Sequence, residues 1–194
     1  MNITKHYYQD NSQEFFDSTV SADVTPLYDR FLKYLPEKGW ILDLGCGSGR
    51  DTKAFLDKGY RVDAIDGSKE LCALASQYTG IEVTCAEFAS IHTENRYDGI
   101  WACASMLHVS SEELPELIER LLRALRPDGI FYLSFKYGDF EGERDDRYFT
   151  DMTEERFHGI LNRTKGSKLV EEWQSTDVRR GRDVDWYNVI LKKK

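Results

Sequence analysis

The chain has 194 residues, of which 41% are hydrophobic and 31% are charged, and its net charge is −8. This length suits one α/β domain and is short for two, and the composition is that of an ordinary globular protein. The acidic balance argues against a nucleic-acid partner, because binding a phosphate backbone requires a basic surface. No apolar run approaches the roughly 18 residues of a membrane helix, and the first residues lack a signal-peptide pattern. We therefore expect no membrane partner, a cytoplasmic location, and a monomer or weak homodimer.

The cysteines point neither to a metal site nor to a disulfide framework. None of them forms a CxxC pair, and no histidine-rich stretch surrounds them. We expect four reduced and mostly buried thiols, at Cys46, Cys72, Cys85 and Cys103, and no bound metal.

From residue 39 onward, strand patterns and helix patterns alternate, which predicts an α/β fold with a largely parallel sheet. Residues 1–38 look helical, so we divide the chain into an N-terminal helical cover at 1–38 and a main domain at 39–194. Short apolar runs predict strands at 40–44, 60–66, 81–86, 97–104 and 130–135. Between them we expect a helix at 50–58, one capped by Ser68, and one opened by the capping box of Ser110 and Glu113.

The last third of the chain begins differently. Residues 136–151 are polar and rich in charges and glycine, which predicts a loop. A helix resumes near Thr153, and two strand patterns then meet at the turn RRGR, residues 179–182. Two strands joined by such a short glycine-containing turn predict an antiparallel hairpin.

A glycine-rich loop follows the first expected strand, in the stretch DLGCGSGRD at 43–51. Ligands of open α/β sheets bind beyond the carboxyl ends of the strands, where this loop lies. A phosphate loop would need Lys-Ser or Lys-Thr after the last glycine, and a dinucleotide fingerprint would need glycine where Arg50 stands. Asp43 would face a pyrophosphate unfavourably and suits a cationic ligand better. Asp66 ends the second strand, where a carboxylate can accept both hydroxyls of a ribose.

The motifs DLGCGSGRD and VDAIDGS resemble the first two motifs of class I S-adenosylmethionine-dependent methyltransferases. The resemblance covers about residues 38–136 and implies a Rossmann-like sandwich, with a seven-stranded, mostly parallel sheet and an antiparallel last strand. It also implies S-adenosyl-L-methionine as cofactor, released as S-adenosyl-L-homocysteine. By the same resemblance, the loop 45–49 carries the methionine end, Asp66 the ribose, and the segment 101–105 lies beside the transferring methyl.

The resemblance also implies that the region after the third strand meets the adenine. Adding Tyr7 from the aromatic N-terminal cover, we expect the cofactor to contact Tyr7, Asp43, Gly45, Cys46, Gly47, Arg50, Asp66, Gly67, Ser68, Glu87, Phe88, Ala102 and Ala104.

A narrower resemblance is to the small bacterial methyltransferases related to tellurite-resistance proteins of the TehB type. It rests on GCGSGRD, GYRVDAIDGS and YDGIWACASMLHVS. Those resistance proteins carry a His-Arg pair shortly before the terminal hairpin, whereas the stretch STDVRRGRD offers arginines and no histidine. This departure argues against tellurite or selenite as the methyl acceptor.

The acceptor side is predicted from residues after the fourth and fifth strands. The segment ACASMLH lacks the [DNS]-PP-[YF] pattern of nucleic-acid N-methyltransferases, so we expect a small-molecule acceptor. His108 lies just past the fourth strand and is either a base or a structural hydrogen-bonding residue. Arg144, Arg147 and Tyr148 are expected to bind the acceptor, the arginines through an anionic part of it. The aromatic-rich segments 1–20 and 136–151 are expected to form a mobile cover over the cofactor.

Two functions from different classes remain open. The first is methyl transfer to a small molecule, and the second is non-catalytic binding or sensing of S-adenosylmethionine on the same fold. A nicotinamide-dependent oxidoreductase is disfavoured, because Arg50 replaces the third glycine of the dinucleotide fingerprint.

Overall fold

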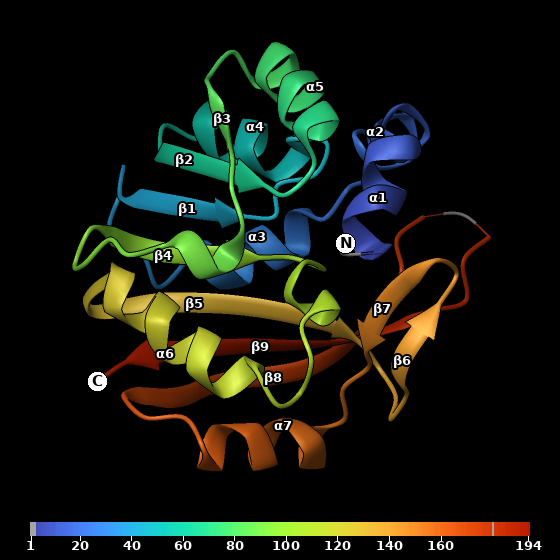
Figure 1. Cartoon of the computed structure of the whole chain (residues 1–194). Helices are drawn as coiled ribbons and strands as arrows, with labels where there is room; N and C mark the ends of the chain where they lie inside the picture. Colours follow the sequence, from blue (N-terminus) through green and yellow to red (C-terminus); the bar gives the residue numbers. More distant parts are fainter. Residues whose placement is uncertain (1–2, 180) are drawn as a thin grey trace.

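A seven-stranded sheet forms the centre of the molecule, with strand order β3-β2-β1-β4-β5-β9-β8 (Figure 1). The structure, a computed structural model, describes residues 3–179 and 181–194. The strands are β1 (Trp40–Leu44), β2 (Arg61–Asp66), β3 (Val83–Cys85), β4 (Tyr97–Ala102), β5 (Leu125–Lys136), β8 (Ser167–Thr176) and β9 (Asp185–Lys193). The strands β1 to β5 run parallel, and β9 lies antiparallel between β5 and β8. This confirms the predicted sheet, including its antiparallel last strand.

Helices cover both faces of the sheet. They are α3 (Thr25–Leu32), α4 (Arg50–Asp57) and α5 (Lys69–Thr79) on one face, and α6 (Leu114–Ala124) and α7 (Glu154–Asn162) on the other. The predicted cap at Ser68 forms, since its hydroxyl accepts a hydrogen bond from the backbone of Leu71, and Thr153 caps α7 in the same way by accepting one from Arg156. Ser110 accepts from the backbone of Glu113, so the predicted capping pair also forms, one turn ahead of α6.

Because side chains alternate along a strand, each sheet face has its own core. On the α3–α4 face, Trp101 of β4 stacks on Tyr132 of β5 with ring centroids 3.9 Å apart, and Phe31 and Phe55 pack against Trp101. On the other face, leucine and isoleucine side chains of α6 pack on β4, β5 and β9. The two cores fix the positions of the strand ends, where the loops emerge.

The segment 136–151, predicted to be a loop, instead contains a small antiparallel hairpin of β6 (Glu141–Arg144) and β7 (Arg147–Thr150). Its turn residues Asp145 and Asp146 both have positive φ, 50° and 56°. Two such residues form the turn type that matches the twist of a hairpin, and aspartate tolerates this conformation better than most residues. The sequence prediction missed the hairpin because Asp-Asp is not the usual signature of this turn.

The N-terminal helices α1 (Ile3–Asp10) and α2 (Ser12–Thr19) lie at the carboxyl ends of the parallel strands, next to the β6–β7 hairpin (Figure 1). The backbone N–H of Tyr148 in β7 donates to the Thr4 hydroxyl in α1 at 2.9 Å. Unlike these two helices, α3 is part of the sheet core, since Tyr28 and Phe31 are buried against β4 and α4. The segment before the first strand therefore divides into a terminal cover and one core helix.

No helix within residues 3–179 and 181–194 is long and apolar enough to cross a membrane. All four cysteines are free thiols, as predicted, although Cys85 is exposed and Cys103 only partly buried.

Candidate functional site

A cavity of about 1220 Å³ lies at the carboxyl ends of β1, β2 and β4. Its walls come from the loops that follow β1, β2, β3 and β4, from α1 and α2, from β7, and from the connection between β8 and β9. Residues from segments far apart in the sequence therefore meet in one space. This volume exceeds that of most pockets for a single small ligand, so two molecules can be held together.

The glycine loop after β1 forms one wall. Gly45 and Gly47 have φ values of +76° and +54°, a region that side-chain-bearing residues rarely adopt. A Cβ atom on Gly45 would lie 2.5 Å from the Cβ of Ser105, and one on Gly47 would lie 2.9 Å from the Phe15 ring. The glycines are therefore required both by the backbone conformation and by the close approach of β4 and α2. Cys46 between them also lines the cavity.

Asp66 fixes this loop against the end of β2. Its carboxylate accepts hydrogen bonds from the backbone N–H of Gly47 at 2.9 Å and of Ser68 at 2.8 Å. Burial raises the pKa of Asp66, and these backbone donors partly oppose the rise. The side chain lines the cavity together with Gly67 and Ser68, as the sequence predicted for the end of β2.

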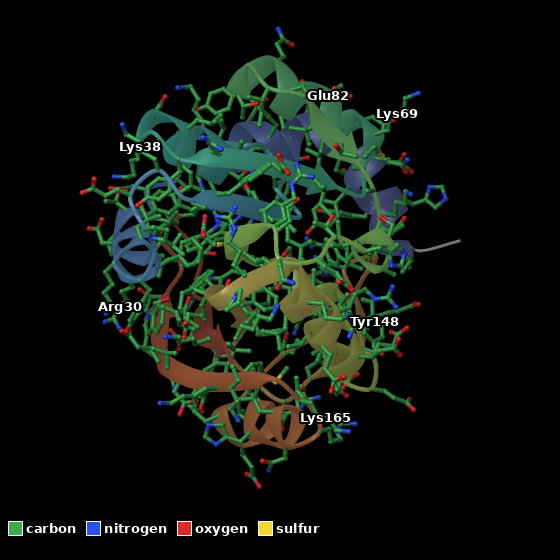
Figure 2. The ribbon with its side chains drawn as sticks, turned by 90° about the vertical axis from the view of Figure 1, so that its left-hand side faces the viewer. Arg30, Lys38, Lys69, Glu82, Tyr148 and Lys165 are labelled. Atoms are coloured by element: carbon green, nitrogen blue, oxygen red, sulfur yellow. The ribbon has the colours of Figure 1, made fainter. Side chains whose placement is uncertain are left out.

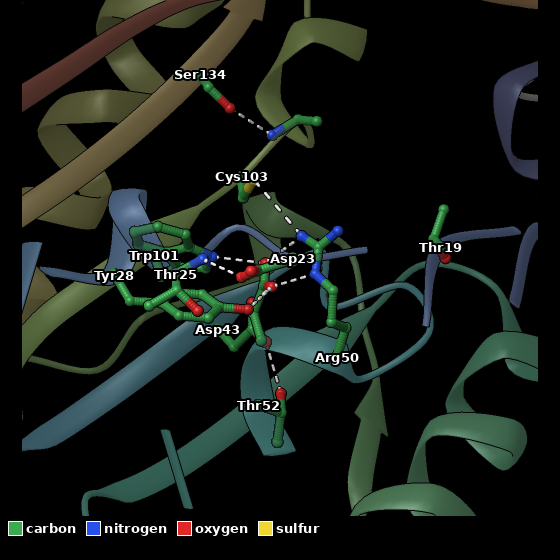
Figure 3. Close-up of polar contacts among 12 residues, drawn as sticks. Thr19, Asp23, Thr25, Tyr28, Asp43, Arg50, Thr52, Trp101, Cys103 and Ser134 are labelled. Carbon is green, nitrogen blue, oxygen red and sulfur yellow. Dashed lines mark hydrogen bonds and ion pairs between the residues drawn. The ribbon is translucent and has the colours of Figure 1, made fainter. Parts of the chain in front are cut away.

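A second buried carboxylate, Asp51, organises the start of α4, and its partners Tyr28, Arg50 and Trp101 are labelled in Figure 3. It accepts from the Tyr28 hydroxyl at 2.6 Å and the Trp101 indole at 2.8 Å, and it pairs with Arg50 through two hydrogen bonds. Burial alone would raise the pKa of Asp51, but Arg50 and the neutral donors outweigh it and hold the pKa below the usual value. Arg50 lines the cavity, and its guanidinium charge is already compensated by Asp51.

Two predicted cofactor residues do not line the cavity. Asp43 is buried beneath the loop, where it accepts a 2.5 Å hydrogen bond from Thr52 in the first turn of α4 (Figure 3). Burial, with a smaller contribution from Asp51, raises the pKa of Asp43 to about 8. The side chain of Ala102 is buried in the core on the α6 face of the sheet. Both residues support the loops and do not face the cavity, because their positions along β1 and β4 point them elsewhere.

The region after β3 contributes Glu87 and Phe88 to the cavity wall, as predicted. Glu87 forms a 2.8 Å ion pair with Lys5 of α1, and both side chains remain well exposed to solvent. Such an exposed pair adds little stability, but it is one of the few polar ties between α1 and the sheet domain. Tyr7 of the same helix also lines the cavity.

His108 follows β4 and sits between α1 and β7. Its Nδ1 lies 2.6 Å from the Tyr148 carbonyl oxygen and its Nε2 lies 2.9 Å from the Tyr8 hydroxyl. Since a carbonyl oxygen only accepts, Nδ1 carries the proton and Nε2 accepts from Tyr8. Burial lowers the pKa of His108 to about 4, and nearby Arg147 and Lys136 contribute to the shift. The imidazole is thus neutral, and Tyr8 occupies its free lone pair.

Strand β7 presents alternate residues to the cavity. Arg147 and Phe149 line it, whereas the side chain of Tyr148 donates to Glu141 at 2.9 Å and lies outside the cavity wall. Arg144 is also outside, because Asp151 holds it in a two-point ion pair with both distances at 3.0 Å. Of the three residues predicted to bind the acceptor, only Arg147 reaches the cavity.

Ser105 ends the segment 101–105 that the resemblance placed beside the transferring methyl. It has a buried Oγ without a hydrogen-bond partner in the described structure, and it faces the glycine loop. The neighbouring Ala104, which was predicted, has a φ of +52° and donates to the Ser134 hydroxyl at 2.8 Å. Such a strained non-glycine residue is typical of a functional site. Lys136 at the end of β5 and Trp186 in β9 also line the cavity, and no local motif marks either of them.

Comparison with known proteins agrees with this geometry. Residues 41–129, which run from β1 into β5, match a methyltransferase domain family. An uncharacterized methyltransferase from Staphylococcus carnosus (strain TM300) is 30% identical over 122 residues, which are 59% of each chain. The N-terminal Xaa-Pro-Lys N-methyltransferase 1 of Rattus norvegicus is 34% identical over 115 residues, covering 54% of this chain and 52% of the relative.

Among solved structures, the fold is similar to that of Burkholderia thailandensis 1,6-didemethyltoxoflavin-N1-methyltransferase, with a TM-score of 0.77 and 23% identity. That alignment covers 97% of this chain and 84% of the other. At this identity the likeness concerns the fold. The family match therefore covers residues 41–129, and the overall fold is similar to that of a methyltransferase whose structure holds S-adenosylhomocysteine. The chain spans only 59% of the length of the Staphylococcus relative.

Proposed function

We propose that the protein binds S-adenosylmethionine in this cavity and transfers its methyl group to a small molecule. The observation that carries the proposal is the joint placement of the glycine loop, Asp66 and His108 around one space large enough for two molecules. Bound S-adenosylmethionine would supply an activated methyl group on a sulfonium cation.

The cavity residues at and beside the glycine loop fit such a cofactor. Gly45 and Gly47 let the loop pack closely against Ser105 and Phe15, because a Cβ at either position would meet these residues. The buried Oγ of Ser105 has no partner in the described structure and is free to hydrogen-bond a ligand at the same wall. Asp66 would accept hydroxyls of a ribose, with Glu87 and Phe88 beside the adenine. In this proposal Asp43 and Ala102 act indirectly, by holding the loops in place.

The chain's own contribution to the reaction is to hold and desolvate the acceptor. Positioning of reactants can supply on the order of 7–11 kcal/mol, whereas general-base help is typically worth about 10²- to 10⁴-fold in rate. The helices α1 and α2 form part of the cavity wall, where they would cover the bound molecules and exclude water. His108 and Tyr8 both line the cavity, and because the Tyr8 hydroxyl is bonded to Nε2, a proton leaving the acceptor would pass to Nε2 by way of that hydroxyl. This proton transfer would raise the rate of methyl transfer, but the reaction would proceed without it.

A small molecule suits the cavity better than a peptide of the kind named for the rat relative. An N-terminal Xaa-Pro-Lys segment is cationic, and the cavity wall carries Lys136 and Arg147, which would repel it. The helices α1 and α2 also leave less access to the cavity for a peptide than for a small ligand. We also propose that the protein belongs to the TehB-type subgroup of small bacterial methyltransferases, which its sequence resembles.

Turnover tests the proposal. Purified protein with S-adenosylmethionine and a panel of thiols, amines, hydroxyls, carboxylates and oxyanions should release S-adenosylhomocysteine with at least one acceptor. A His108→Ala variant should then show a reduced but measurable rate with unchanged cofactor affinity. Tight cofactor binding without turnover on any acceptor would instead favour a non-catalytic binding or sensing protein.

A further inference from the structure

One aromatic ring in the cavity wall, that of Phe149, is surrounded by three cations. The Nζ of Lys136 lies 4.1 Å from the centre of the Phe149 ring, and the guanidinium carbons of Arg144 and Arg147 lie 4.7 and 5.0 Å from it. Three cations therefore share one ring, and a ring face attracts only weakly compared with a carboxylate.

Carboxylates compensate only one of the three. Arg144 is neutralised by its two-point pair with Asp151. Arg147 donates to the backbone oxygen of Asp145 at 3.3 Å, and its guanidinium lies over the Tyr7 ring and near the Tyr8 ring. Within residues 3–179 and 181–194, neither Lys136 nor Arg147 forms a salt bridge. Both of these cations line the cavity.

Two half-buried cations without a counter-charge are costly, because each is partly desolvated and each repels the other. The pKa of Lys136 reflects this cost: burial is the main cause that lowers it, and the charges of Arg144 and Arg147 lower it further. The nearby aspartates Asp151 and Asp145 act in the opposite direction without reversing the shift. Within the described residues, neither aspartate forms an ion pair with Lys136, which therefore lacks a directly bound anion.

The cavity wall carries charges of both signs. Asp66 and Glu87 come from the ends of β2 and β3, whereas Lys136 and Arg147 come from β5 and β7. Flat side chains, including Tyr7, Phe149 and Trp186, line the same cavity as these two cations. A ligand that matches this wall has a negative group and a flat apolar body.

We propose that the methyl acceptor is an anionic, flat small molecule whose carboxylate, phosphate or similar group binds between Lys136 and Arg147. This inference rests on the proposed function and specifies the class of its second substrate. The anion would complete the charge balance that the chain leaves open. It would also be drawn toward the positive charge of the sulfonium held in the same cavity.

The test compares benzoate with benzamide, which share a shape and differ in charge. Each is titrated into ¹⁵N-labelled protein saturated with S-adenosylhomocysteine, and binding is followed by chemical-shift changes. We expect benzoate to bind at least tenfold more tightly. Lys136→Met, which keeps the aliphatic stem on Phe149, and Arg147→Gln should each weaken benzoate about tenfold and leave benzamide unchanged.

Lys165→Gln is the matched control, since it removes one positive charge from an exposed turn after α7 (Figure 2). It should leave both affinities unchanged. Equal affinities for benzoate and benzamide, or a loss of benzoate binding in Lys165→Gln as large as in the cavity variants, would overturn the anion site. Binding of S-adenosylhomocysteine is measured separately by calorimetry. Its absence would overturn the proposed function and this inference together, whereas intact binding with the results just named would overturn the inference alone.

Discussion

Gly45 stands where the loop after β1 comes closest to the end of β4. An alanine there would keep a φ of +76° and place its Cβ 2.5 Å from the Cβ of Ser105. The conformational strain costs about 1–2 kcal/mol, and the clash adds to it. We expect Gly45→Ala to lower the free energy of unfolding by about 3 kcal/mol or more in urea denaturation. Gly59→Ala is the control, because Gly59 has a φ of +85° and no neighbour within 4 Å. Equal losses in both variants would mean that the close approach contributes nothing.

His108 is expected to stay neutral well below the ordinary histidine range. Its pKa in the folded protein, about 4, is below the unfolded value near 6.5, so the unfolded chain takes up a proton first as the pH falls. The stability due to the neutral ring is complete above pH 6.5 and is lost as the pH falls from 6.5 toward 4. Nitrogen NMR of the histidine rings should show His108 as the Nδ1–H tautomer with no titration between pH 8 and 5.5. A midpoint near 6.5 would contradict the buried pair with Tyr8.

Several site residues were predictable from local patterns, and others were not. Gly45, Gly47 and Asp66 follow from motif spacing next to a strand, and all of them line the cavity. Lys136 was not predicted, because nothing in its own sequence neighbourhood shows that β7 brings Arg147 and Phe149 beside it. The wrong placement of Tyr148 has a similar cause: a segment taken as a loop gives no alternation from which to decide which side chains face inward.

At the scale of elements, the strands and caps were predicted closely and the β6–β7 hairpin was not. β1 begins and ends where the apolar run at 40–44 does, because its pattern is that of a strand buried on both faces. The hairpin lacks such a pattern, and its turn forms from two aspartates. Its position depends on contacts with α1, such as the hydrogen bond from Tyr148 to Thr4, which join residues 144 positions apart. Local sequence does not encode contacts of that range.

The helices α1 and α2 and the segment 136–151 are expected to respond together to the cofactor. Their ties to each other include the stacking of Arg147 on Tyr7 at 4.0 Å and the hydrogen bond from the Tyr148 N–H to the Thr4 hydroxyl. A ligand under this cover should stabilise it, because local opening is then coupled to release. Hydrogen exchange should slow at least fivefold in both segments on addition of S-adenosylhomocysteine, while α7, on the far side of the sheet, should not change. Protection limited to the glycine loop would show that the cover does not close on the ligand.

At the scale of the whole molecule, the fold class was predicted from the sequence because strand order and ligand position in this architecture follow from a few rules. Parallel strands place their loops at one end, and the glycine loop marks the strand beside which a ligand binds. The sequence predicted that Arg144 and Arg147 contact an anionic part of the acceptor, but only Arg147 lines the cavity, together with Lys136, which no motif marked. This wall depends on β5, β7 and β9 together, and so on the folded arrangement of three separate segments.

The central claim is that this cavity binds S-adenosylmethionine at the glycine loop and Asp66. Calorimetric titration of S-adenosylhomocysteine into the wild type and Asp66→Ala tests it most directly, with Glu82→Ala as a control that removes an exposed carboxylate just before β3 (Figure 2). Loss of charged hydrogen bonds costs about 1.5–3 kcal/mol, roughly a tenfold to hundredfold loss of affinity. We predict binding to the wild type and Glu82→Ala, and weakening of at least tenfold in a folded Asp66→Ala. No binding to the wild type, or equal binding to all three proteins, would contradict the account.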